Sequence, residues 1–238
     1  MTQALILAAG IGSRLRPLTH DRPKALIELG GAPIIAHALD SLVQAGVKRT
    51  VVVTGHCHER LEAWLAGRGE IDVETVENPA YASTNTLASL AAAVHLIEDD
   101  FLLIDGDLAF EPAIVSRLLG PGTRVAVVPT PTLDDDAVEV AVEGERIIAV
   151  GKRLPAPFAP VGESIGMAKI DIDVGERLFV AARRLLDAGG ARLYYESAFE
   201  RLIAEGEVFE MADVTGLKWV EVDDHSDLQR AIAAFAVC

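Results

Sequence analysis

A short apolar strand that runs directly into a glycine-rich turn constrains the fold of this chain more than any other feature. Residues 5–9 are all apolar, and Gly10 and Gly12 follow them. Glycine adopts backbone angles that other residues avoid, so successive N–H groups after such a strand can converge on a phosphate oxygen. Arg14 and Lys24 come next and would add positive charge. The stretch therefore predicts a phosphate-binding turn at the end of a first strand.

Two common phosphate-binding patterns do not fit this turn. No Gly-Lys-Ser/Thr follows Gly10 at the spacing of an ATPase P-loop. The dinucleotide-binding fingerprint fails as well, because its third glycine position holds Leu15. A glycine turn that merely connects a strand to the next element remains the structural alternative.

Strand and helix patterns alternate through the first half of the chain. Strands are predicted over residues 4–8, 50–54, 73–76 and 101–104, and helices over 34–45, 58–65 and from 86 to about 97. This alternation favours right-handed crossovers and a parallel sheet. Because ligands of such sheets bind at the carboxyl ends of the strands, the Gly10 turn lies where a site is expected.

The second half is less regular. Strands are predicted over residues 124–128, 138–142, 147–150, 162–172 and 217–223, and helices over 177–188, from about 195 to 204 and from about 226. Residues 143–146 have the composition of a hairpin turn, and the proline-rich stretch 154–161 is typical of a surface loop. With no internal repeat, one domain is predicted over residues 1–238.

Charge and composition exclude several classes of protein. The formal net charge is −15, so most of the surface would repel a nucleic-acid backbone. No apolar run approaches the roughly 20 residues that span a bilayer, and no basic segment precedes the first apolar residues. Only two cysteines occur, Cys57 and Cys238, so a disulfide framework is not expected. We therefore expect a cytoplasmic monomer or homodimer without nucleic-acid or membrane partners.

A pair of carboxylates follows the fourth predicted strand in the sequence Asp105-Gly106-Asp107. A carboxylate at the carboxyl end of a buried parallel strand is well placed to hold Mg²⁺ against a triphosphate. An ordinary turn is the alternative interpretation, because Asp-Gly is a frequent turn dipeptide. Asp105 is expected to orient its neighbours, and Asp107 is the candidate metal ligand.

A polar block at residues 78–90 precedes an alanine-rich helix and contains Asn78, Thr84, Asn85 and Ser89. Amide and hydroxyl groups at a helix start can read the edge of a pyrimidine base. Any single residue of 83–85 could instead be only the N-cap of the helix. The block is therefore a candidate nucleotide-base contact.

Four ordered blocks resemble the signature of the GT-A-like nucleotidyltransferases, which activate sugar-1-phosphates and small alcohol phosphates. They are Leu-Ala-Ala-Gly-x-Gly-x-Arg-Leu-x-Pro-Leu-Thr with Pro-Lys-Ala-Leu at 7–26, Asn-Pro-x-Tyr-x-x-Thr-Asn-x-x-x-Ser-Leu at 78–90, Asp107, and Trp-x-Glu-Val-Asp followed by Asp-Leu at 219–228. The second block is similar to that of the phosphocholine and 2-aminoethylphosphonate cytidylyltransferases, where it lies beside the base. The resemblance implies an α/β fold, a Rossmann-like (GT-A-type) three-layer sandwich with a mixed, mostly parallel central sheet.

The resemblance also implies roles for individual residues. Asp107 and Asp223 match the two carboxylates that hold Mg²⁺, and Glu221 shares a strand face with Asp223 and could also reach the site. Lys152 matches the lysine that meets the acceptor phosphate. The nucleotide-binding part covers about residues 1–120, and the acceptor-binding part about 121–238. The predicted nucleotide-binding residues are Leu7, Ala8, Ala9, Gly10, Gly12, Ser13, Arg14, Lys24, Asn78, Thr84, Asn85, Ser89 and Asp105.

These residues predict one reaction, in which an acceptor phosphate oxygen attacks the α-phosphorus of CTP and pyrophosphate leaves. Arg14 and the Gly10 turn would hold the pyrophosphate side, Lys24 the α-phosphate and Lys152 the incoming phosphate, which makes these three the predicted catalytic residues. Glu163 and Glu196 are candidate acceptor contacts for an amine or for hydroxyl groups. Because aromatic residues are only 5% of the chain, the cage expected for a quaternary ammonium group is not evident. The expected acceptor is an aminoalkyl or polyol phosphate or phosphonate.

Two other functions remain open at this point. The first is a sugar-1-phosphate uridylyl-, thymidylyl- or guanylyltransferase, since the types of hydrogen-bonding residue do not by themselves identify the base. The second is a non-catalytic nucleotide-binding subunit that keeps the fold. Arg14, Lys24, Asp107 and Asp223 argue against the second, because a binding module does not need two metal carboxylates.

Overall fold

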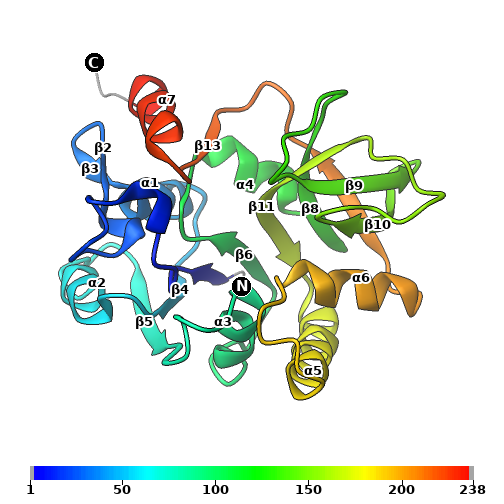
Figure 1. Cartoon of the computed structure of the whole chain (residues 1–238), viewed down its shortest axis with the longest axis horizontal. Helices are drawn as coiled ribbons and strands as arrows, with labels where there is room; N and C mark the ends of the chain where they lie inside the picture. Colours follow the sequence, from blue (N-terminus) through cyan, green and yellow to red (C-terminus); the bar gives the residue numbers. More distant parts are fainter. Residues whose placement is uncertain (1–2, 236–238) are drawn as a thin grey trace.

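A nine-stranded sheet runs through the computed structural model of the chain, which describes residues 3–235 (Figure 1). In spatial order its strands are β5 (Asp72–Glu77), β4 (Arg49–Thr54), β1 (Gln3–Leu7), β6 (Phe101–Asp105), β11 (Gly162–Ile170), β8 (Thr123–Pro129), β12 (Phe209–Asp213), β10 (Arg146–Gly151) and β9 (Val138–Glu143). Two small sheets accompany it. They pair β7 (Leu108–Phe110) with β13 (Trp219–Glu221), and β2 (Glu28–Leu29) with β3 (Ala32–Pro33).

Helices cover both faces of the large sheet. They are α1 (Ile34–Gln44), α2 (His58–Leu65), α3 (Thr86–Ala92), α4 (Pro112–Leu118), α5 (Ile172–Asp187), α6 (Glu196–Ala204) and α7 (His225–Phe235), with short 3₁₀ turns at Ser13–Leu15 and Lys24–Leu26. Leu5 and Leu7 of β1 pack in the core under α3, α5 and α6, whereas Ala4 and Ile6 pack in the core under α1, α2 and α4. Successive side chains of a strand point to opposite faces, so an entirely apolar strand fits a layer that is buried on both sides. The predicted three-layer sandwich is confirmed.

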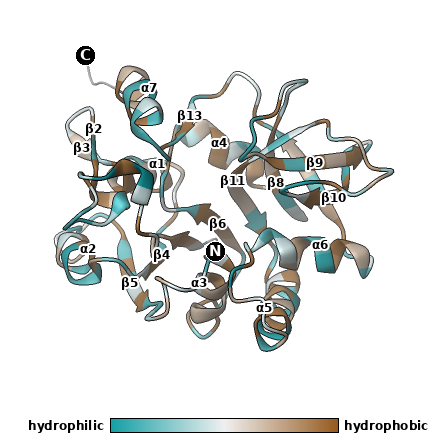
Figure 2. Cartoon of the chain, viewed as in Figure 1, coloured by the Kyte–Doolittle hydropathy of each residue, from teal (hydrophilic) through white to brown (hydrophobic). Residues whose placement is uncertain are grey.

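The hydropathy of the elements follows this layering. In Figure 2 the central strands β1, β4 and β6 are brown, whereas α5 and α6 also carry teal residues. Those helices bury an apolar stripe against the sheet and turn charged residues to solvent, as amphipathic helices do. A third, smaller core joins Leu228 and Ala231 of α7 to Leu15 and Leu29 of the N-terminal segment. The last helix is thereby packed beside the first loops of the chain.

The large sheet is less parallel than predicted. β5, β4, β1 and β6 pair in parallel, as do β8 and β12. The five pairings β6–β11, β8–β11, β9–β10, β10–β12 and β9–β11 are antiparallel, against four parallel ones. The mixed sheet is confirmed, and the prediction that it is mostly parallel is wrong. An apolar run indicates that a strand is buried but not which way its neighbours run, so the antiparallel pairing of β11 with β6 and β8 was not readable from it. The hairpin turn predicted at residues 143–146 is confirmed, because it joins the antiparallel strands β9 and β10.

Several element boundaries also differ from the predictions. α5 begins at Ile172, directly after β11, instead of at residue 177, and α3 ends at Ala92 instead of near residue 97. The strand predicted over 217–223 is only β13, and it pairs with β7 outside the large sheet. β7, α4 and β12 were not predicted, because each is short, although the proline at the first position of α4 is a helix-start signal.

Three further predictions concern individual segments. The stretch 154–161 is a largely exposed loop between β10 and β11, as predicted. Cys57 is a free thiol just before α2, and Cys238 lies outside the described residues. Within residues 3–235, none of the helices has the length and apolar character needed to cross a bilayer.

The turn after β6 packs tightly against the end of β1. The two strands pair in parallel up to their last residues, and the Gly106 N–H donates to the Leu7 carbonyl oxygen at 3.0 Å. A Cβ at Gly106 would lie 2.7 Å from that oxygen and 2.7 Å from the Ala8 Cα. Glycine is therefore required here, and it keeps the carboxylates of this turn beside the Gly10 turn.

We expect Gly106→Ala to lower the free energy of unfolding by about 1–3 kcal/mol, because backbone atoms must move to admit the methyl group. Gly69→Ala is the matched control, since a Cβ there would have no atom within 4 Å. That substitution should be neutral or stabilise the fold by up to about 1 kcal/mol. Urea unfolding followed by circular dichroism measures both, and equal effects of the two would contradict the close packing.

Candidate active site

A cleft of about 680 Å³ lies at the carboxyl ends of β1 and β6 and extends to β11 and α6. Every residue of the predicted site lines it. These residues are Leu7, Ala8, Ala9, Gly10, Gly12, Ser13, Arg14, Lys24, Asn78, Thr84, Asn85, Ser89, Asp105, Asp107, Lys152, Glu163, Glu196 and Asp223. The fold thus gathers the four sequence blocks in one place.

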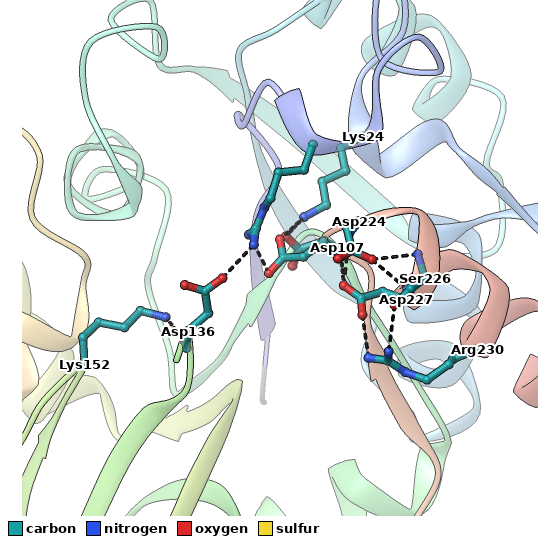
Figure 3. Close-up of polar contacts among 10 residues, drawn as sticks. Lys24, Asp107, Asp136, Lys152, Asp224, Ser226, Asp227 and Arg230 are labelled. Atoms are coloured by element: carbon teal, nitrogen blue, oxygen red, sulfur yellow. Dashed lines mark hydrogen bonds and ion pairs between the residues drawn. The ribbon is translucent and has the colours of Figure 1, made fainter. Parts of the chain in front are cut away.

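Lys24 lies between two carboxylates that come from distant parts of the chain (Figure 3). Its Nζ is 2.5 Å from Asp107 Oδ2 and 2.7 Å from Asp223 Oδ1. Burial alone would lower the pKa of Lys24, but the attraction of the two carboxylates outweighs burial and holds that pKa above its usual value. Arg14 Nη2 adds a second cation, 2.9 Å from Asp223 Oδ2. Both cations of the N-terminal blocks therefore point at the predicted metal carboxylates.

Asp107, Glu221 and Asp223 form a carboxylate cluster whose oxygens lie within 4.8 Å of one another. The pairing of β13 with β7 creates it, because the Val222 N–H donates to the Asp107 carbonyl oxygen at 3.1 Å. Asp107 Oδ1 is buried and has no hydrogen-bond partner among the described residues. Carboxylate oxygens are the ligands that Mg²⁺ prefers, so this set fits a magnesium ion. The expectation that Glu221 could reach the site is confirmed.

The surroundings of Glu221 in this cluster raise its pKa. Burial, followed by the nearby Asp107 and Asp223 carboxylates, raises the pKa of Glu221 to about 8. Lys24 and Lys152 oppose that rise but do not cancel it. Burial and the two neighbouring carboxylates thus favour the neutral form of Glu221, whose pKa they raise.

Asp136, in the loop between β8 and β9, links the two sides of the cleft. Its Oδ2 accepts a hydrogen bond from Arg14 Nη1 at 2.7 Å, and its carbonyl oxygen accepts one from Lys152 Nζ (Figure 3). Lys152 Nζ also lies 5.1 Å from the centroid of the Tyr194 ring. Asp136 was not a predicted site residue, and its only sequence signal is the acidic run in which it lies. Through it, the cations predicted for the nucleotide and for the acceptor meet at one residue.

The polar block after β5 is held together by its own hydrogen bonds. Asn78 Nδ2 donates to Thr84 Oγ1 at 3.2 Å and to Ser89 Oγ at 3.1 Å. Asn85 is the N-cap of α3, and its side chain accepts a hydrogen bond from the Thr86 N–H at 2.9 Å. The N-cap interpretation is therefore correct for Asn85, and the network orders the loop where it lines the cleft.

Three further acidic residues line the cleft at β11, α6 and β6. Burial raises the pKa of Glu163, with Asp134 adding to the rise and Lys152 opposing it. Burial likewise raises the pKa of Glu196 at the start of α6. Asp105 is partly buried, and burial together with neighbouring carboxylates raises its pKa well above the ordinary range. Burial is thus the main cause that favours the neutral forms of these three acids, and the nearby lysines oppose it only in part.

Asp227 organises the loop that carries Asp223. Its Oδ2 accepts hydrogen bonds from the backbone N–H groups of Asp223 at 2.9 Å and of Asp224 at 3.0 Å. Asp224 Oδ1 in turn accepts from the N–H groups of Ser226 and Asp227, and Arg230 pairs with Asp227 (Figure 3). Asp227 was noted only as part of a motif, although an acidic residue in the first turn of a helix is a capping signal. It positions Asp223 without itself belonging to the carboxylate cluster.

The sequence model of one protein family, described as the MobA-like NTP transferase domain, matches residues 4–199. The chain belongs to this family. The predicted membership of the nucleotidyltransferases is thereby confirmed, and the chain is a nucleotidyltransferase domain.

Individual relatives of this MobA-like domain include cytidylyltransferases. The CMP-5'-(3-aminopropyl)phosphonate synthase of Streptomyces rubellomurinus is 32% identical over 98% of this chain, which covers 39% of that protein. The 2-aminoethylphosphonate cytidylyltransferase of Lancefieldella rimae is 42% identical over 41% of this chain and 39% of that protein. The chain thus matches well under two thirds of the length of either relative.

A solved structure shows the same fold. The inositol-1-phosphate CTP transferase of T. maritima superposes with a TM-score of 0.82 at 22% identity, over 100% of this chain and 98% of that one. At this identity the likeness establishes the nucleotidyltransferase architecture, including its mixed α/β sheet.

We expect Asp227→Ala to lower the free energy of unfolding by about 1–2 kcal/mol, because two N–H groups near the start of α7 lose their acceptor. Asp173→Ala is the control, since Asp173 lies in the first turn of α5, is exposed and makes no side-chain hydrogen bond to the described residues. Its effect should stay within about 0.5 kcal/mol. Urea denaturation measures both, and an unchanged midpoint for Asp227→Ala would show that this loop does not depend on Asp227.

Proposed function

We propose that this nucleotidyltransferase domain is a cytidylyltransferase. It transfers CMP from CTP to a small organic phosphate or phosphonate of the aminoalkyl or polyol type and releases pyrophosphate. The observation that carries the proposal is the cleft in which Lys24, Asp107 and Asp223 are joined by ion pairs while Lys152 lines the opposite side. Such a site can hold two anionic reactants at once, which is the main task of a phosphoryl-transfer enzyme.

The N-terminal turn supplies the nucleotide side. A Cβ at Gly10 would meet no atom within 4 Å, so the turn leaves free space above its backbone for a phosphate. Gly12 has a φ of +63°, a conformation that glycine adopts without strain. Arg14 and Lys24 then neutralise the β- and γ-phosphates and the α-phosphate, respectively.

Lys152 binds the incoming phosphate or phosphonate. An oxygen of that group attacks the α-phosphorus, the bond from the α-phosphorus to the bridging oxygen breaks, and pyrophosphate takes the electron pair. Arg14 and Lys24 stabilise the charge that gathers on the leaving group and on the α-phosphate. Mg²⁺ held by Asp107, Glu221 and Asp223 would supply further neutralisation of the triphosphate.

The choice of CTP rests on two supports. The block that contains Asn78, Thr84, Asn85 and Ser89 lines the cleft beside α3, where a pyrimidine edge could be read. The two relatives described above are named for CMP transfer. We further propose that residues 1–120 bind mainly the nucleotide and 121–238 mainly the acceptor, in a cytoplasmic monomer or homodimer.

The decisive assay measures pyrophosphate release from each of the four nucleoside triphosphates with Mg²⁺. The acceptor panel holds phosphocholine, 2-aminoethylphosphonate, inositol and glycerol phosphates and sugar-1-phosphates. Turnover with CTP and a small phosphate or phosphonate supports the proposal. Turnover with UTP, dTTP or GTP and a sugar-1-phosphate would assign the site to sugar activation. No pyrophosphate release with any pair of nucleotide and acceptor would favour a non-catalytic nucleotide-binding role.

We expect Asp107→Asn to reduce kcat/KM for CMP transfer by about 10³-fold or more, because the variant loses one charge of the metal-binding cluster. Asp187→Asn, at the exposed end of α5, is the matched control and should leave kcat/KM within about twofold. Pyrophosphate release at saturating Mg²⁺ measures both. Unchanged release from Asp107→Asn would disprove the role given to the carboxylate cluster.

A further inference from the structure

A second concave surface lies between α5 and the segment formed by α3 and the turns that follow it. It is a groove of about 650 Å³, and the residues that line it are all different from those that line the active-site cleft. α3 and α5 cover the same face of the large sheet and lie side by side there (Figure 1). The apolar lining of the groove consists of Ala91, Val94, Ile97, Ile172, Phe179 and Val180. Apolar surface gathered on the outside of a helix layer is typical of a protein contact.

Val180 lies at the centre of the outward face of α5. Its exposed fraction is 51%, the highest among the large hydrophobic side chains of residues 3–235. Its neighbours on this face are charged, with Glu176 one turn before it and Arg183 and Arg184 one turn after it. An amphipathic helix normally turns polar side chains to solvent. An exposed valine at this place, beside an apolar groove, therefore indicates a contact surface.

The charged residues of the groove are not paired within the chain. Glu98, Glu176, Arg183 and Arg184 are exposed, and none of them makes an ion pair or a side-chain hydrogen bond to residues 3–235. Glu176 is separated from the two arginines by roughly 10–12 Å of helix, so it cannot pair with them in the same chain. Two acids and two bases at the groove are thus available to a partner.

The order of these charges along α5 fits a second copy of the same chain. The acid Glu176 precedes Val180, and the bases Arg183 and Arg184 follow it. When two such helices pack antiparallel about a two-fold axis at Val180, Glu176 of each copy lies level with the two arginines of the other, so the pairing forms twice. With His95 neutral, the groove carries two acids against two arginines, whereas the whole chain has a net charge of −15. Two copies therefore repel each other least at this surface.

We propose that the groove between α3 and α5 is the interface of a homodimer in which the two α5 helices pack antiparallel, with Val180 of each copy at the two-fold axis. α5 has 16 residues, so about 24 Å of helix is available to the contact. The two valines bury apolar surface at the centre, and the ion pairs of Glu176 with Arg183 and Arg184 form a polar rim around them. No groove residue lines the cleft, so this inference does not depend on the proposed reaction.

Analytical ultracentrifugation of the full chain measures the association directly. We expect a species of twice the mass of one chain, with a dissociation constant of about 10 µM or lower. Val180→Asp would bury two unpaired carboxylates at the axis, so the dissociation constant should rise at least about 100-fold. Leu119→Asp is the matched control, because Leu119 is a 37% exposed apolar residue at the end of α4, on the opposite face of the sheet. This control should dimerise like the unmodified chain.

Charge reversal tests the antiparallel arrangement. Glu176→Arg places like charges opposite each other at both ends of the contact, so the dissociation constant should rise about tenfold or more. Arg183→Glu combined with Arg184→Glu should have the same effect. All three substitutions in one chain restore opposite charges across the axis, and the dissociation constant should return to within about threefold of that of the unmodified chain. Circular dichroism checks that each variant is folded, and the triple variant decides the matter if Val180→Asp does not fold.

The outcomes decide between this interface and its alternatives. Loss of the dimer in Val180→Asp, its retention in Leu119→Asp and its recovery in the triple variant would support the proposal. A chain that stays monomeric up to about 100 µM would overturn it. A dimer that survives Val180→Asp would overturn it as well, because that dimer would use another surface. A triple variant that associates as weakly as the variants with one reversed sign would contradict the antiparallel pairing.

Discussion

The ammonium group of Lys24 joins three segments that are far apart in the sequence. It pairs with Asp107, 83 residues away, and with Asp223, 199 residues away. Two carboxylates this close repel each other in a partly buried cleft, and the cation offsets that repulsion. The arrangement of the phosphate-binding turn, the end of β6 and the β13–α7 loop depends on this contact. Because a buried ion pair loses most of its stabilisation when one partner is removed, the three residues form one unit.

Beyond this unit the cleft is lined by further acidic groups. The raised pKa values of Asp105, Glu196 and Glu221 share burial as their first cause. A divalent cation at the Asp107 cluster would favour the ionised forms of the carboxylates around it. Arg14, Lys24 and Lys152 are basic residues in the lining of the same cleft, and under the proposed function they receive the phosphates.

Much of the fold and the site was predictable from the sequence. The apolar run of β1 and the alternation of strands and helices around α1 and α2 indicated a layered α/β sheet. The glycine at position 12 fits the positive φ of its backbone. Every predicted site residue lines the cleft, because the carboxyl ends of neighbouring strands meet at one edge of a sheet. Apart from the hairpin of β9 and β10, strand direction in the second half was not predictable, since burial patterns do not identify the partner of a strand. Asp136 was not predictable either, because its contacts with Arg14 and Lys152 exist only after a distant loop folds over the cleft.

The sequence by itself determined the family, the layered fold class and the set of charged residues, because ordered motifs and apolar periodicity are local properties of a chain. The tertiary structure decided how those charges are shared. It placed Lys24 between Asp107 and Asp223 and aligned Glu221 with them through the β7–β13 pairing. These are distances between residues remote in sequence, and only the packed sheet and its long connections set them. The folded molecule therefore determines which carboxylates are paired with a cation of the chain.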